Sequence, residues 1–240
     1  TYFISRDKNA ELHIPHEDGP QRGKLPLHYW IAFFGFFCSI SSEFAITFWS
    51  AALLRERVGS TAAVSTICIV AVGSGMAIGR WYGGIVLKKL RVDHQLATAI
   101  ALQLISFMIF WFSHNLVGSL IALFGVGLGI STQFSLSSVR LITLSNNKPD
   151  LAIARSSIAA GLAIGLAPFM LGVLGDHLGI SRAYMMVPVL ILISLFITLL
   201  IPSKSRHNRE SQNLKLRAIF VLFCNRVKRD SVKRQTIQNQ

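Results

Sequence analysis

One carboxylate interrupts a long uncharged stretch of the sequence, residues 30–54. Glu43 lies 14 residues after Tyr29 and 12 residues before Arg55, which at about 1.5 Å per residue puts it near the middle of a helix that crosses a bilayer. An ionised carboxylate at that depth costs on the order of 2.5–3.5 kcal/mol. Because burial favours the neutral form of a carboxylate, Glu43 is a candidate proton carrier. The alternative is a protonated side chain that only hydrogen-bonds to a neighbouring helix.

Polar residues recur around Glu43 at helical spacing. Ser39 lies four residues before it, and Thr47 and Ser50 lie four and seven residues after it. Residues at these spacings share one face of a helix. This polar face predicts contact with water or a ligand.

Three further polar side chains lie inside apolar stretches. Gln133 is the next candidate for substrate contact and Gln103 follows it, although an interhelical hydrogen bond is the alternative for each. Arg80 lies eight residues before Lys88, about 12 Å inside the end of its stretch. Arg80 is a candidate gating or positioning residue that could extend towards Glu43 or back to the membrane interface.

Six apolar stretches carry these residues. A helix needs about 20 apolar residues to cross the hydrocarbon layer of a membrane, and a composition of 52% hydrophobic and 15% charged residues is atypical of a soluble protein. Within the six stretches, Glu43 and Arg80 carry the only formal charges. The sequence therefore predicts an all-α membrane protein with six transmembrane helices, at residues 30–54, 61–87, 96–112, 116–139, 156–174 and 183–201.

Two polar segments flank the predicted bundle of residues 30–202. Residues 1–29 lack the basic start and apolar core of a signal peptide and are interpreted as a linker or a truncation point. Residues 203–240 carry ten basic and two acidic side chains. Within them, residues 214–229 (LKLRAIFVLFCNRVKR) predict either an interfacial helix held by anionic membrane lipids or an unstructured basic tail.

Lysine and arginine gather in alternate breaks between the stretches. KKLR follows the second stretch, and Arg140, Lys148 and Arg155 follow the fourth, whereas the remaining three breaks together have a net charge of only +1. Because basic loops stay in the cytoplasm, this distribution predicts a multi-pass plasma-membrane protein with both termini cytoplasmic.

Small residues line one face of the fifth stretch. The spacings of four, three and four residues between them predict a face for helix packing with a kink at the proline; the alternative is that glycine is simply frequent in membrane helices. The residues are Gly161, Gly165, Pro168 and Gly172.

Other kinds of function find no support in the sequence. The three cysteines have no paired spacing, the histidines have no metal-ligand spacing, and no nucleophile elbow or carboxylate dyad is present. The basic residues flank apolar stretches instead of lying among stacking aromatic residues, which argues against a nucleic-acid partner. We therefore predict neither an enzyme nor a bound cofactor or metal.

Residues 75–91 (GMAIGRWYGGIVLKKLR) resemble the second helix in the C-terminal half of a major facilitator superfamily transporter and its following cytoplasmic loop. That loop in the family has a GxxxDRxGRR-like signature. Gly84 stands at the leading glycine, Lys88 at the acidic position and Lys89 at the basic one. The acidic residue is lost, which puts in doubt any gating contact that the family's aspartate makes.

Two other stretches extend the resemblance to residues 27–202. Residues 156–179 (SSIAAGLAIGLAPFMLGVLGDHLG) are similar to the fifth helix of that half, and EFAITFWS is similar to its first helix in bacterial permeases, including sugar permeases. The resemblance implies a bundle of two inverted three-helix repeats, which would pair with an N-terminal six-helix half if the chain is a fragment.

This resemblance also implies a function. We expect alternating-access transport of a small solute such as a sugar, drug or metabolite, coupled to protons by symport or antiport. Glu43 would be the proton or substrate site and Gln133 a cavity contact. The alternative is a noncatalytic half-transporter that acts as a membrane scaffold and whose basic tail binds lipid or a partner.

Overall fold

A computed structural model describes residues 23–58, 62–86 and 90–203. All regular structure in these ranges is helical. Five of the helical segments are long and apolar enough to cross a membrane, and a sixth, α2, is apolar over the shorter range Ile67–Gly83. The predicted all-α membrane protein with about six helices of membrane-spanning length is confirmed at this level. The predicted interfacial helix at residues 214–229, and Lys88 and Lys89, lie outside the described residues.

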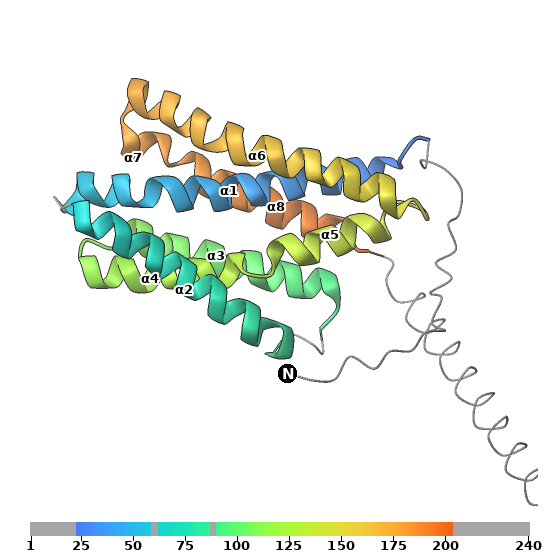
Figure 1. Ribbon diagram of the computed structural model, residues 1–240, viewed down its shortest axis with the longest axis horizontal. Helices are drawn as coiled ribbons and strands as arrows, with labels where there is room; N and C mark the ends of the chain where they lie inside the picture. Colours follow the sequence, from blue (N-terminus) through green and yellow to red (C-terminus); the bar gives the residue numbers. More distant parts are fainter. Residues whose placement is uncertain (1–22, 59–61, 87–89, 204–240) are drawn as a thin grey trace, which may run out of the picture.

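The helices run along a common direction (Figure 1). Two of the six segments are interrupted: α4 and α5 form one broken segment, and α7 and α8 form another. The bounds are α1 Leu27–Val58, α2 Ala62–Val86, α3 Val92–Phe112, α4 Leu116–Ile130, α5 Gln133–Thr143, α6 Pro149–Leu178, α7 Ile180–Ala183 and α8 Met186–Leu200.

Several helices are longer than the apolar stretches that predicted them. The structure places Asp93 and Arg140 inside helices α3 and α5, whereas the sequence assigned both to breaks between helices. The fourth break shrinks to residues 144–148, where Asn146 and Asn147 adopt the left-handed conformation that asparagine tolerates better than most residues. The fifth break shrinks to Gly179, whose φ of 82° favours glycine.

Local sequence signals account for the N-terminal ends of α4 and α6. The side chain of Asn115 caps α4 by accepting a hydrogen bond of 2.6 Å from the backbone N–H of Gly118. Pro149 opens α6, where its missing N–H is not needed, and Asp150 follows in the first turn, where a negative charge is favourable.

The helix contacts form two groups, one around α4 and one around α1. Helix α4 packs most extensively against α2 and α3, whereas α1 packs most extensively against α6 and α8. Contacts between α3 and α8 and between α1 and α5 join the two groups. Helices α2 and α6 lie on opposite sides of the bundle (Figure 1).

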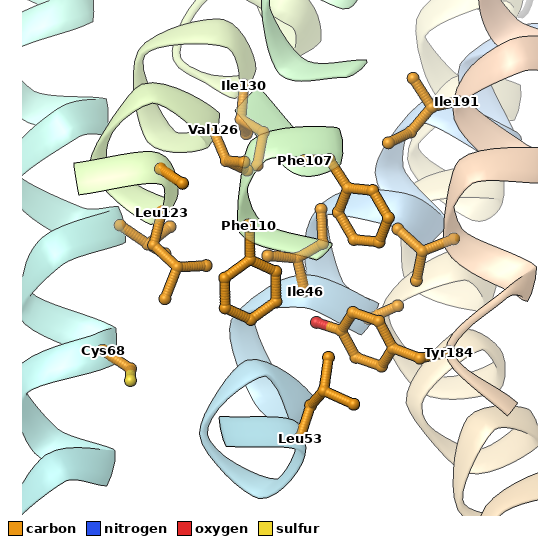
Figure 2. Packing of buried hydrophobic residues seen from close by; sticks show 14 of the residues in the cluster. Ile46, Leu53, Cys68, Phe107, Phe110, Leu123, Val126, Ile130, Tyr184 and Ile191 are labelled. Carbon is orange, nitrogen blue, oxygen red and sulfur yellow. The ribbon is translucent and has the colours of Figure 1, made fainter. Parts of the chain in front are cut away.

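Buried apolar side chains from α1, α3, α4 and the α7–α8 segment form the larger core (Figure 2). The ring of Tyr184 stacks on that of Phe107 with 5.8 Å between centroids, and Figure 2 shows Leu53 and Ile46 of α1 near these rings. A second core joins α1 to α6 through Tyr29, Phe36, Ala152 and Ala159.

Glycines bring α4 into close contact with both of its neighbours. A Cβ added to Gly75 of α2 would collide with the carbonyl oxygen of Phe124, and one added to Gly127 of α4 would collide with that of Val72. On another face of α4, a Cβ at Gly129 would lie 2.6 Å from the backbone nitrogen of Gln103. Backbone approach through small residues is how helices associate in lipid, where hydrophobic burial gives little driving force.

The glycine face predicted on α6 is used differently. Nothing lies within 4 Å of a Cβ added to Gly161 or Gly165, whereas a Cβ at Gly172 would lie 3.2 Å from the Trp49 ring. Pro168 lies inside the helix, half-buried. Within the described residues, close glycine packing therefore occurs around α4, and a packing role for Gly161 and Gly165 stays a prediction.

Candidate functional site

Glu43 lies at the middle of α1. It is preceded by 16 residues of that helix and followed by 15, and the helix is about 48 Å long at 1.5 Å per residue. Its side chain is half-buried. The carboxylate therefore lies at the middle of a helix that is long and apolar enough to cross a membrane, and it is partly exposed.

Arg80 of α2 is exposed, and its charge acts on the Glu43 carboxylate. No ion pair joins these two described residues. The Nε of Arg80 instead donates a long hydrogen bond of 3.4 Å to the carbonyl oxygen of Ser131. Arg80 thus contacts the break that separates α4 from α5.

The break at Ser131 and Thr132 interrupts a segment of membrane-spanning length, Leu116–Thr143. Irregular backbone at membrane depth is tolerated only where other protein groups or water satisfy it. Here the hydroxyl of Ser131 bonds to the carbonyl of Leu128 at 2.7 Å, and Arg80 bonds to the carbonyl of Ser131. A Cβ added to Gly79 would collide with the Ser131 side chain, so α2 packs directly against the break.

Three of the predicted site residues form a closed hydrogen-bond network instead of lining an open cavity. The Ser39 hydroxyl donates to Gln133 Oε1, and Gln133 Nε2 donates to Gln103 Oε1 at 2.8 Å. Gln103 Nε2 then donates to the Ser42 hydroxyl at 3.1 Å, and that hydroxyl donates to the Ser39 carbonyl at 2.8 Å. We name these four side chains the Gln–Ser network.

The glutamines of the Gln–Ser network are buried. Gln103 is 1% exposed and Gln133 is 2% exposed. Their amide groups bond mainly to each other and to Ser39 and Ser42, and Gln133 also donates to the carbonyl of Gly129 at 3.1 Å. In this conformation the network makes interhelical hydrogen bonds between α1, α3 and α5, and a solute would have to break them to bind.

The other two hydroxyl groups of the polar face on α1 differ in their hydrogen bonding. The Thr47 hydroxyl donates to the backbone carbonyl of Glu43 at 2.9 Å. Ser50 is buried, and its hydroxyl has no hydrogen-bond partner among the described residues. Glu43 is the ionisable residue of this face, and it is half-buried. Gly84 lies near the C-terminal end of α2.

One buried ion pair was missed by the sequence analysis. Nε of Arg140 on α5 lies 3.2 Å from Oδ1 of Asp93 on α3, and the two side chains are 4% and 10% exposed. Oδ2 of Asp93 accepts hydrogen bonds of 2.8 Å from the backbone N–H and the hydroxyl of Ser203. We call Asp93, Arg140 and Ser203 the ionic cluster.

Arg140 of the ionic cluster also caps the C-terminal end of α8. Its guanidinium donates to the carbonyls of Ile197, Thr198 and Ile201 and to the Thr198 hydroxyl, so it bonds to carbonyl groups of the last turn, where helix carbonyls lack partners further along the helix. A sequence signal for the pair existed. Asp93 lies just before the third apolar stretch, and Arg140 lies just after the fourth. The predicted topology puts these two positions on the same side of the membrane.

Comparisons of the sequence with protein-family models and with curated proteins found no match.

Proposed function

We propose that the chain forms one half of a secondary transporter of the major facilitator type, which moves a small solute by alternating access. The observation that carries this proposal is the half-buried carboxylate of Glu43 at the middle of a 32-residue helix. Ionisable residues at that depth mark proton and substrate pathways in membrane proteins. Glu43 would carry a proton or contact the solute, and Arg80 would position or gate it.

The packing pattern supports the repeat architecture of such a half. If α1, α2 and α3 form one repeat and the segments α4–α5, α6 and α7–α8 form the other, then the first helix of each repeat packs against the second and third helices of the other. Two repeats that exchange their first helices in this way fit the inverted topology of many transporters. The central helices α1 and α4 then carry the site.

The broken segment α4–α5 supports the same proposal. Discontinuous helices at the interface between repeats hold the substrate and coupling-ion sites of many transporters. Here Arg80, whose charge acts on the Glu43 carboxylate, donates a hydrogen bond to the carbonyl of Ser131 at the break. The excess of lysine and arginine in alternate breaks supports a plasma-membrane orientation with both ends in the cytoplasm.

A noncatalytic scaffold is the second candidate, and the Gln–Ser network favours it. Gln133, Gln103 and Ser39 were candidate solute contacts, but their hydrogen bonds are made within the bundle. A scaffold needs such satisfied polar contacts and no open site. In such a scaffold, Glu43 would have no access to water.

Access of water to position 43 tests the proposal without knowledge of the substrate. The variant Glu43→Cys is expected to react with a membrane-impermeant thiol reagent in liposomes, and the control Ala45→Cys, at a fully buried position, is expected to stay unreactive. The native cysteines would be replaced by serine in both. Equal protection of the two positions from both sides of the membrane would refute an aqueous pathway.

Proton coupling is tested by variants of two glutamates on the same helix. In liposomes that contain the chain, or the longer carrier if the gene encodes one, candidate sugars and the cationic dye ethidium are supplied on one side and proton flux is followed with a pH dye. We expect Glu43→Gln to abolish solute-evoked flux and Glu56→Gln, at an exposed position, to keep it. Unchanged flux in Glu43→Gln would refute the carrier role, and no flux with any solute would favour the scaffold.

A further inference from the structure

Helices α1 and α6 begin side by side at the same end of the bundle (Figure 1). The hydroxyl of Tyr29 in the first turn of α1 donates a hydrogen bond of 3.0 Å to the carbonyl of Ala152 in α6, and both residues are buried. Leu25 and Ala32 pack in the same core. The relative position of the two helix starts is therefore held by apolar packing and by a buried hydrogen bond.

A tryptophan and an arginine stack on the outside of this corner. The guanidinium carbon of Arg155 lies 5.1 Å from the centroid of the Trp30 ring. The Trp30 ring is in turn held edge-on by Tyr29 and Phe33, at centroid distances of 5.8 and 5.3 Å. This arrangement orders the guanidinium in advance of any ligand, as stacked arginines do at anion sites.

The donors of Arg155 are not used within the described part of the chain. No hydrogen bond or carboxylate there engages its guanidinium, which is half-buried. Other cationic groups lie close by, because Lys148 precedes α6 and its ammonium group lies beside Gly23, next to Lys24. Residues 23–30 and 148–155 together carry three lysine or arginine side chains and one carboxylate, Asp150. The corner is therefore cationic and has unused donors.

The depth of Arg155 lets its side chain reach the headgroup layer of a membrane. Helix α6 has 30 residues, about 45 Å, whereas the hydrocarbon layer is about 30 Å thick. If the excess is shared between the two ends, about 7 Å of the helix projects at each. Arg155 is six residues after Pro149, about 9 Å along the helix. On this estimate the Arg155 backbone lies about 2 Å inside the hydrocarbon boundary, close enough for its long side chain to reach the headgroup layer, and tryptophan favours the same interfacial level.

We propose that the α1–α6 corner, formed by Trp30, Arg155, Lys148 and Lys24, binds the headgroup of an anionic phospholipid. Arg155 donates to the phosphate, and the lysines supply the additional positive charge that selects an acidic headgroup over a zwitterionic one. Basic pockets between membrane helices bind acidic lipids by this chemistry. The site is independent of the transport proposed above, since it lies at the start of α1 and requires neither Glu43 nor a substrate.

A matched control lies at the other end of α1. Arg57 near the end of α1 also stacks on a tryptophan, with its guanidinium carbon 4.1 Å from the centroid of Trp111. Its guanidinium already donates to the carbonyl of Trp111, and Glu56 is adjacent in the sequence. The two arginines therefore share the stacking geometry, but the guanidinium of Arg57 already has a hydrogen-bond partner and a carboxylate next to it in the sequence, whereas that of Arg155 has neither among the described residues.

The test measures binding of phosphatidylglycerol to the full chain by native mass spectrometry, with phosphatidylcholine as the zwitterionic reference. We expect wild type to prefer phosphatidylglycerol, Arg155→Gln to lower that affinity about tenfold, and Arg57→Gln to leave it within about twofold. Any binding by the basic tail is the same in all variants and does not affect the comparison. Arg155→Lys, which keeps the charge, is expected to lie between wild type and Arg155→Gln.

Three results would overturn this assignment. One is an equal affinity of wild type, Arg155→Gln and Arg57→Gln for phosphatidylglycerol, and another is an equal loss in both variants. The third is competition by millimolar inorganic phosphate, which would show a site for free anions instead of lipid. If Arg155→Gln fails to fold, the Arg155→Lys variant and the Lys148→Gln variant carry the test, and unchanged affinity in both refutes the site.

Discussion

The ionic cluster allows a quantitative test of how the bundle is held together. Asp93→Asn keeps the size of the side chain but removes the charge that faces Arg140, whose side chain is 4% exposed. Removal of one partner from a buried ion pair typically costs about 3–5 kcal/mol of unfolding free energy, because the other charge stays buried without compensation. Four oxygens of residues 197–201, at the C-terminal end of α8, still surround the guanidinium, so we expect the lower value, about 3 kcal/mol.

Thermal unfolding in detergent provides the assay. Cys38 and Cys68 are buried, so a thiol-reactive dye reports their exposure on unfolding in a background where Cys224 is replaced by serine. A loss of about 3 kcal/mol corresponds to a fall in Tm of about 6–12 °C for a chain of this size. Asp150→Asn, at an exposed carboxylate in the first turn of α6, serves as the control and is expected to cost under about 1 kcal/mol.

The double variant distinguishes loss of the ion pair from the destabilisation that each substitution causes on its own. Asp93→Asn combined with Arg140→Gln removes both charges, so we expect it to be less destabilised than the sum of the two single variants. A Tm for Asp93→Asn within about 2 °C of the parent, or equal to that of Asp150→Asn, would contradict the reasoning. Strict additivity of the two single changes would show that the groups do not interact.

Two further predictions concern packing and the Gln–Ser network, and both use the same thermal assay. Gly75→Ala is expected to lower Tm by several degrees because its methyl group meets the backbone of α4, whereas Gly73→Ala, two residues earlier with nothing within 4 Å, is expected to be neutral or slightly stabilising; equal effects would contradict the proposed packing. Gln133→Leu leaves buried partners of the network without hydrogen bonds and is expected to cost about 1–3 kcal/mol for each unsatisfied group. Thr98→Ala, at an exposed hydroxyl that bonds its own helix, should cost little, and a similar small loss for Gln133→Leu would show that the network contributes no stability.

The six apolar stretches could be read from the sequence because of a constraint that acts on each helix separately. In hydrocarbon every backbone N–H and C=O must be bonded internally, so a long apolar stretch has to be helical whatever its neighbours are. The same reasoning located Glu43, whose depth depends only on its distance along one helix. The structure places it at the middle of α1.

The helix ends were predicted too short because polarity was taken to indicate a turn. Asp93 and Arg140 are charged, and a single stretch cannot show that the two charges neutralise each other inside the bundle. Once they are paired, each can stay in a helix. The break at Ser131 and Thr132 was missed for a different reason. Residues 116–139 contain no charged side chain, so the uncharged polar residues that follow Ile130 did not indicate a break.

The sequence by itself determined that the chain is helical, which stretches can cross a membrane and that a carboxylate lies at mid-depth, because these properties follow from one helix and its surroundings. Only the tertiary structure decided which partners the polar groups and glycines have. It assigned Gln103 and Gln133 to each other, Arg140 to Asp93, and the closest backbone contacts to α4 instead of α6. Pairing depends on the rotation and register of neighbouring helices, which no single apolar stretch encodes.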